Sequence, residues 1–173
     1  MGGPGMNVAG IDFSSHAIDV VLVDVDGRKP PRWHRYPLTG ADAFDRTRSV
    51  ANSMPGRSSA YWDNVLAVGI EHPAGKFGTG PLMRLQGAVL AQIPARMLVK
   101  AWPPGAWRKA VGLPGNASKQ DVQGYVHKRH RSGWIVSQGP TTSVSDLLWE
   151  QDACDAYCIA LATQHAITTQ EAA

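Results

Sequence analysis

Four acidic residues stand where a carboxylate could bind a metal ion. Asp12 lies near the end of a short apolar run, Glu71 closes another, and Asp152 and Asp155 are three residues apart in an alanine-rich stretch. Four carboxylates in one pocket are not expected all to ionise unless a cation offsets their charge. Two Mg²⁺ ions roughly 4 Å apart would do so, and this arrangement cleaves phosphodiester bonds by in-line displacement. The sequence therefore suggests a two-metal site, provided that the fold brings the four acids together.

Asp12 taken alone also has a structural interpretation. It belongs to a strand-like segment that runs into Ser14 and Ser15. Neighbouring side chains of a strand point to opposite faces, so Asp12 is held rigidly on the face away from Ile11. A lone acid at such a place is as often a turn or cap residue as a metal ligand. Convergence with the other acids is what favours the ligand role.

Asp152 and Asp155 likewise allow two interpretations. Carboxylates three apart on a helix lie on one face, where their charges repel. Acids at a solvated helix start would be stabilised by the helix dipole, whereas acids on a buried face would need a cation. The turns that follow, Ala156 to Ala162, are apolar and mostly small, which suits close contact with a sheet.

The elements that must position these acids alternate between strands and helices. Strands are expected at 6–13, 17–25, 33–38, 64–71 and 96–101. Helices are expected at 41–53, 81–92, 106–111 and 119–131, and from Ser143 or Ser145 to 168. Thr39 is the expected cap of the helix at 41–53, and Ser118 is that of the helix at 119–131. This order predicts an α/β domain with a mixed five-stranded sheet and helices on its faces.

The strand at 64–71 is apolar almost throughout, which indicates a parallel strand covered on both faces. If it lies beside the strand at 6–13, Asp12 and Glu71 sit next to each other. A late helix crossing there would add Asp152 and Asp155.

Length and composition bound the possibilities. The 173 residues, 43% hydrophobic and 18% charged, suit one globular domain. We expect a leader at 1–6, the domain at 7–168 and a tail at 169–173. No apolar run approaches the ~20 residues of a membrane span. The start lacks the regions of a signal peptide, so the protein is expected in the cytoplasm, with no membrane partner. Cys154 and Cys158 have no zinc-site spacing and are expected to be reduced and buried.

The net charge of +3 permits nucleic-acid binding without requiring it. A basic cluster at the end of the helix at 119–131 holds Lys128, Arg129 and Arg131. It is either a solvated helix end that suits the dipole or, with Arg108, Lys109 and Lys119, a phosphate-binding surface.

The helix at 81–92 has two apolar faces. Leu82, Leu85 and Val89 share one, and Met83, Gly87 and Leu90 share the other. The second face either contacts a second copy of the chain, as in a homodimer, or is buried inside the monomer.

Taken together, three motifs resemble the RuvC-like Holliday junction resolvases of the RNase H-like superfamily. They are the segments 9–14 (AGIDFS), 69–71 (GIE) and 152–162 (DACDAYCIALA), with 108–112 and 119–122 between them. The resemblance spans about 8 to 165 in matching order. It implies the RNase H-like mixed five-stranded sheet with helices on both faces.

The resemblance also implies a homodimer that binds a four-way DNA junction and nicks two opposed strands symmetrically. Asp12, Glu71, Asp152 and Asp155 would hold two Mg²⁺ ions, with Asp12 bridging them and Mn²⁺ able to substitute. One ion would orient the attacking water and the other would stabilise the departing 3′ oxygen. By the same resemblance, Lys119 and either Arg108 or Lys109 would contact phosphates, and Phe77 would stack on bases near the junction.

Two alternatives remain open at this point. The same metal chemistry could serve a nuclease for other branched DNA, such as flaps or forks, and the motifs do not distinguish the two. A non-catalytic junction-binding protein is the other alternative, although the presence of all four acids argues against it.

Overall fold

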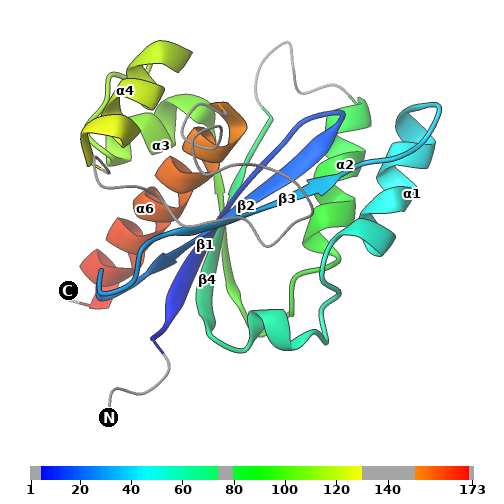
Figure 1. Cartoon of the computed structure of the whole chain (residues 1–173), viewed down its shortest axis with the longest axis horizontal. Helices are drawn as coiled ribbons and strands as arrows, with labels where there is room; N and C mark the ends of the chain where they lie inside the picture. The colour runs from blue at the N-terminus through cyan, green and yellow to red at the C-terminus, as the bar shows by residue number, and fades with distance from the viewer. Residues whose placement is uncertain (1–4, 74–79, 130–150, 172–173) are drawn as a thin grey trace.

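The computed structural model describes residues 5–73, 80–129 and 151–171. Five strands form one sheet in the order β3-β2-β1-β4-β5 (Figure 1). The strands are β1 (Asn7–Phe13), β2 (Ala17–Asp24), β3 (Arg32–Pro37), β4 (Val65–Glu71) and β5 (Leu98–Trp102). The helices are α1 (Ala43–Ser53), η1 (Ala60–Trp62), α2 (Gly80–Leu90), α3 (Pro104–Ala110), α4 (Lys119–Arg129) and α6 (Gln151–Glu171).

The sheet is mixed because its first three strands form a meander and the last two cross over. β1 and β2 pair antiparallel, as do β2 and β3. β4 pairs parallel with β1 on one side and with β5 on the other. The predicted mixed five-stranded sheet is confirmed, and the condition set for bringing Asp12 beside Glu71, that β1 and β4 are neighbours, is met.

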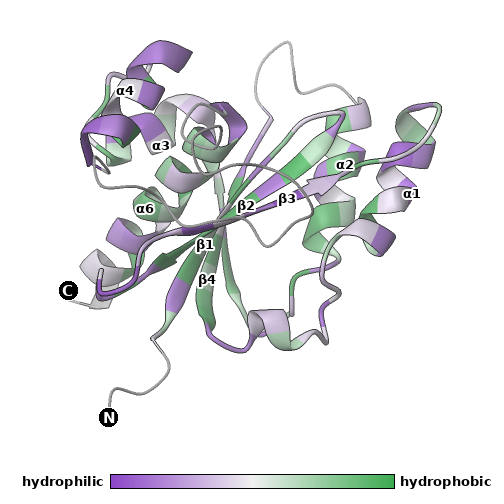
Figure 2. Cartoon of the chain, in the orientation of Figure 1, coloured by the Kyte–Doolittle hydropathy of each residue, from purple (hydrophilic) through white to green (hydrophobic). Residues whose placement is uncertain are grey.

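Helices cover both faces of the sheet. In Figure 1, α3, α4 and α6 lie on one side of the strands and α1 and α2 on the other. An apolar core lies between the sheet and each helix layer. Val21, Trp107 and Ile159 belong to the core under α3, α4 and α6, and Val20 and Leu85 belong to the core under α1 and α2. Figure 2 shows the central strands as mainly hydrophobic and much of α4 as hydrophilic. The strands are therefore clamped between two apolar layers, which fixes the side chains at their ends.

Helix α6 lies unusually close to the central strands because two glycines face it. A Cβ atom at Gly10 of β1 would overlap the Ala156 carbonyl oxygen and lie 2.9 Å from the Ala160 Cβ. A Cβ at Gly69 of β4 would overlap the Thr163 hydroxyl. The absence of side chains at these two positions lets the helix backbone approach the sheet.

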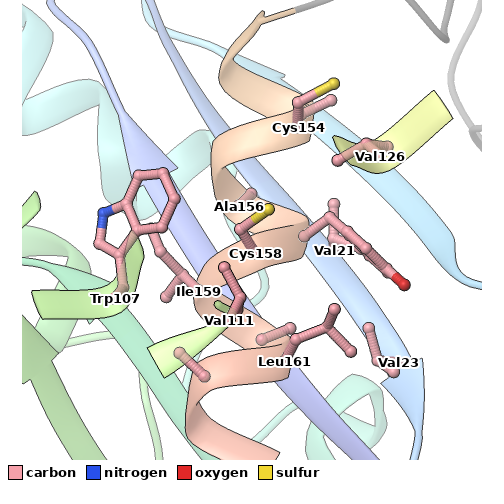
Figure 3. Close-up of a cluster of buried hydrophobic side chains, with 14 of the residues drawn as sticks. Val21, Val23, Trp107, Val111, Val126, Cys154, Ala156, Cys158, Ile159 and Leu161 are labelled. Atoms are coloured by element: carbon pink, nitrogen blue, oxygen red, sulfur yellow. The ribbon is translucent and has the colours of Figure 1, made fainter. Parts of the chain in front are cut away.

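The two cysteines lie in the core on the α6 side. Cys154 and Cys158 are buried, as predicted, and no disulfide joins them. Figure 3 shows Cys158 on α6 beside Val111, with Val126 near Cys154. Their thiols fill space between helices, and burial raises the pKa of Cys158.

Several boundaries differ from the expected ones. The N-cap of α1 is Asp42, which accepts hydrogen bonds from the amides of Phe44 and Asp45, so the expected cap at Thr39 was wrong. Ser118 caps α4 as predicted: its hydroxyl accepts from the Asp121 amide at 3.2 Å. Helix α6 continues to Glu171, past the domain end expected at 168, and its expected start before 151 lies outside the described residues. In the described part of the chain, no helix is long and apolar enough to cross a membrane.

Candidate active site

A row of charged residues crosses four strands on the face covered by α6. Arg35 of β3 pairs with Asp19 of β2, and Asp19 pairs with Asp12 of β1. The parallel pairing of Ile11 with Ile70 places Glu71 of β4 beside Asp12. Residues paired in register point to the same side of a sheet. Three acids therefore stand side by side, with an arginine at the end of the row.

Helix α6 adds two more carboxyls to this row. Asp152 and Asp155 lie in its first turns, and their charges act on Asp12, with that of Asp152 also acting on Glu71. Asp155 is 8% exposed and accepts a 2.8 Å hydrogen bond from the Gln151 amide. The solvated helix start considered from the sequence is therefore wrong for Asp155, whereas the Asp152 side chain is 28% exposed.

The acids repel one another strongly. Burial raises the pKa of Asp12 well above its ordinary value, and the charges of Glu71, Asp155, Asp152 and Asp19 raise it further, in that order. Burial, then the charge of Glu71, raises the pKa of Asp155 to about 7. The structure thus brings together the four acids singled out from the sequence, and their shared field favours protons or cations.

Glu71 is held from two sides. The indole N–H of Trp107 in α3 donates to Glu71 Oε2 at 3.0 Å, and the Gln86 amide of α2 donates to the Glu71 backbone oxygen at 3.0 Å. Burial raises the pKa of Glu71, but the Trp107 hydrogen bond and the charge of Arg108 oppose the rise. Trp107 is fully buried, so it fixes the carboxyl in one orientation.

Asp19 and its partners were not singled out from the sequence. Asp19 has no exposed surface and accepts a 2.7 Å hydrogen bond from the Trp33 indole N–H. Arg35 Nη2 lies 3.9 Å from Asp19 Oδ2 and 3.6 Å from Asp152 Oδ2. The sequence did contain a signal for Asp19: it is an acid inside a mostly apolar strand, and a buried acid needs hydrogen-bonding or charged partners.

The predicted DNA-binding residues fall into two groups. Arg108 lowers the pKa of both Glu71 and Asp155, and Lys119 lowers that of Glu71, so both lie within electrostatic reach of the acids. Lys109 is exposed on α3 and lines a surface hollow with Gly115 and Asn116.

The other basic residues lie elsewhere. Arg129 lines a hollow of about 620 Å³ beside the turn between β2 and β3, with Asp24 and Tyr157, rather than the row of acids. Lys128 is exposed next to it on α4. Phe77 and Arg131 lie outside the described residues.

The donors of the row fit a hard divalent cation. Asp12, Glu71, Asp152 and Asp155 offer carboxylate oxygens, the ligands that Mg²⁺ prefers. Across residues 5–73, 80–129 and 151–171, no three His, Cys, Asp or Glu side chains yet stand close enough together to hold a metal. The four carboxyls are nevertheless near enough for their charges to raise the pKa of Asp12 and of Asp155.

Solved structures similar to this chain are junction-resolving proteins. Thermus thermophilus RuvC matches with a TM-score of 0.60 at 21% identity, over 95% of this chain and 97% of that one. T. thermophilus RuvC in complex with a Holliday junction substrate matches with a TM-score of 0.58 at 20% identity, over 95% and 96%. The yeast mitochondrial Holliday junction resolvase matches with a TM-score of 0.53 at 12% identity, over 98% and 83%.

No protein-family model matches the chain, and no curated protein matches its sequence. The similarity is thus one of three-dimensional structure, spread over nearly the whole chain. The chain has the RNase H-like fold of RuvC, as the sequence predicted.

Proposed function

We propose that this chain is a metal-dependent endonuclease that resolves four-way DNA junctions by symmetric nicking as a homodimer. The observation that carries the proposal is that four acids gather near the C-terminal ends of β1 and β4: Asp12, Glu71, Asp152 and Asp155. The fold shared with resolvases, one of them solved with junction DNA, supports the choice of substrate.

Three of the four acids are each held in place by a different part of the structure. Asp12 is fixed by the central strand, Glu71 by the Trp107 indole, and Asp155 by the Gln151 amide. Such outer partners orient ligands and tune their affinity. Asp12, between Asp19 and Glu71 in the row, would hold the metal together with Glu71 and the two α6 acids, Asp152 and Asp155.

Bound Mg²⁺, or Mn²⁺ in its place, would supply Lewis-acid activation of water and phosphate. The protein's own contribution is a largely buried cluster of oxygen donors whose repulsion favours a cation. Arg108 and Lys119, on the rim of this cluster, would contact the phosphates of the cleaved strand and hold it over the acids.

Two copies of the chain would contact each other through the exposed apolar face of α2. Met83 and Leu90 are 41% and 38% exposed, so burial of this face inside the monomer, the alternative considered from the sequence, is wrong. An exposed apolar helix face suits a symmetric contact, and two copies would present two sites to opposed strands.

The test is cleavage of a synthetic four-way junction in Mg²⁺, beside linear duplex, flap and fork substrates of the same sequence. Paired, symmetric nicks confined to the junction would support the proposal. Cleavage spread over flaps and forks would instead indicate a general branched-DNA nuclease. Tight binding without cleavage in either Mg²⁺ or Mn²⁺ would indicate a non-catalytic protein.

A further inference from the structure

We infer that Arg35 is a resident counter-charge that competes with metal for Asp152. Arg35 pairs with Asp152, and an incoming divalent cation must take this carboxylate from it. Asp19, which is not one of the proposed ligands, also pairs with Arg35 and would keep it in place when Asp152 turns to a metal. The inference rests on the proposed metal site and adds a residue that sets its affinity.

The geometry of one nitrogen atom carries the argument. Arg35 Nη2 lies between two acids on different elements, 3.9 Å from Asp19 Oδ2 in β2 and 3.6 Å from Asp152 Oδ2 in α6. Both distances exceed the ~2.7–2.9 Å of short charge-assisted hydrogen bonds. The pairs are therefore held by charge attraction, and Asp152 can leave without breaking a short hydrogen bond.

The two acids differ in what they can do without Arg35. Asp19 has no exposed surface, so it cannot turn to water, and Trp33 fixes its other oxygen. Asp152 is 28% exposed at the start of α6, so it can rotate toward a metal held by Asp12 and Glu71. A buried carboxylate holds its cationic partner more firmly than a half-exposed one does, because water does not replace the partner.

The pairing also ties Asp152 to the β3 end of the row. Arg35 belongs to β3 and Glu71 to β4, so the partner of Asp152 stands at the opposite end of the row from Glu71. Removing Arg35 would free Asp152 and would also remove a positive charge that repels the metal. Both effects favour metal binding.

The test measures Mn²⁺ affinity, by electron paramagnetic resonance of the free ion, for the whole chain and its Arg35→Gln variant. The variant should bind Mn²⁺ about three- to fivefold more tightly, the range expected for a partly exposed ion pair. Arg35→Lys, which keeps the charge, should bind like the original chain. Arg96→Gln is the matched control, because Arg96 pairs with Asp63 at the same 3.6 Å on another part of the surface. Unchanged or weaker Mn²⁺ binding by Arg35→Gln would overturn the inference.

A second readout is the melting temperature in EDTA. Arg35→Gln should lower it more than Arg96→Gln does, and the loss should shrink when Asp19 is replaced by Asn. An equal loss in both backgrounds would contradict the link to Asp19. If the original chain binds no Mn²⁺, or if Asp12→Asn binds it equally well, the proposed metal site itself fails. If instead the original chain binds Mn²⁺ and Arg35→Gln binds it with the same affinity, the metal site stands and only the role of Arg35 fails.

Discussion

The indole N–H of Trp107 lies 3.0 Å from a carboxylate oxygen of Glu71, and this hydrogen bond joins α3 to the end of β4. Glu71 was evident from the sequence as an acid closing a buried strand. Trp107 was not, because its partner is 36 residues away and is reached only after β5 has paired beside β4.

Replacing Trp107 with Phe should loosen Glu71 and weaken metal binding. Loss of an outer hydrogen-bond partner lowers metal affinity or activity by roughly 10- to 100-fold. Trp62→Phe is the matched control, since Trp62 is also fully buried and donates to a backbone oxygen on the other side of the sheet. The measurement is the Mg²⁺ concentration that gives half-maximal cleavage, which should be higher for Trp107→Phe than for Trp62→Phe. Equal Mg²⁺ requirements would mean that Trp107 only fills the core.

The stability of the metal-free chain should depend on Asp155 with a definite sign. Its pKa is raised from 3.8 to about 7, so the folded chain holds this proton more tightly than the unfolded chain does. The contribution of Asp155 to stability is present below pH 4 and is lost as the pH rises through about 7. Asp155→Asn should therefore gain stability relative to the original chain between pH 5 and pH 8.

Urea denaturation in EDTA at several pH values measures this difference. A difference that stays constant with pH, or that reverses, would contradict the raised pKa. Added Mg²⁺ at pH 8 should stabilise the original chain more than the variant, because Asp155 is mostly ionised at that pH and a bound cation offsets its charge, whereas Asn carries none.

The close contact between α6 and the sheet should make Gly10 intolerant of a side chain. Gly10→Ala places a methyl group against backbone atoms of Ala156 and Ala160, so α6 must shift with its acids. We expect a loss of about 1–3 kcal/mol or more, typical of overpacking, and weaker metal binding. Gly124→Ala in α4 meets no atom within 4 Å and should be neutral or stabilising. Thermal unfolding of both variants checks this, and equal stability would show that α6 can move aside freely.

Much of this architecture could be predicted from the sequence because its signals are local. The apolar run at 64–71 indicated a buried parallel strand, and the small residues after Asp155 indicated a helix lying on a sheet. The positions of Asp12 and Glu71 then followed from strand adjacency. The role of α6 as the cover of these strands agrees with the contacts at Gly10 and Gly69.

The sequence did not reveal that Asp19 and Arg35 join the row of acids, because this depends on the register between paired strands. Asp19 joins the row only because it pairs with Asp12, and Arg35 joins because it pairs with Asp19. A shift of one residue in either pairing would turn these side chains to the other face. The surroundings of the basic end of α4 also depend on the fold, since charge clustering alone did not reveal that Arg129 lines a hollow with Asp24 and Tyr157.

The dimer proposal predicts that charge on α2 disrupts association. Met83→Glu with Leu90→Glu should convert the dimer to a monomer and abolish paired nicking, since both side chains are exposed on the helix. Leu66→Glu is the control, because Leu66 is similarly exposed, at 43%, but lies on β4. Sedimentation equilibrium gives the mass in each case. A double variant that remains dimeric would place the interface elsewhere.

The most direct test of the account is cleavage and binding of a four-way junction by Asp12→Asn. Asp12 is central to the row, and metal activation is worth several kcal/mol, so cleavage in Mg²⁺ should fall by on the order of 10³-fold. Junction binding should persist, since the basic residues are unchanged. Asp63→Asn, on a remote ion pair, should cut normally. Normal cleavage by Asp12→Asn would contradict the assignment of the row of acids as the active site.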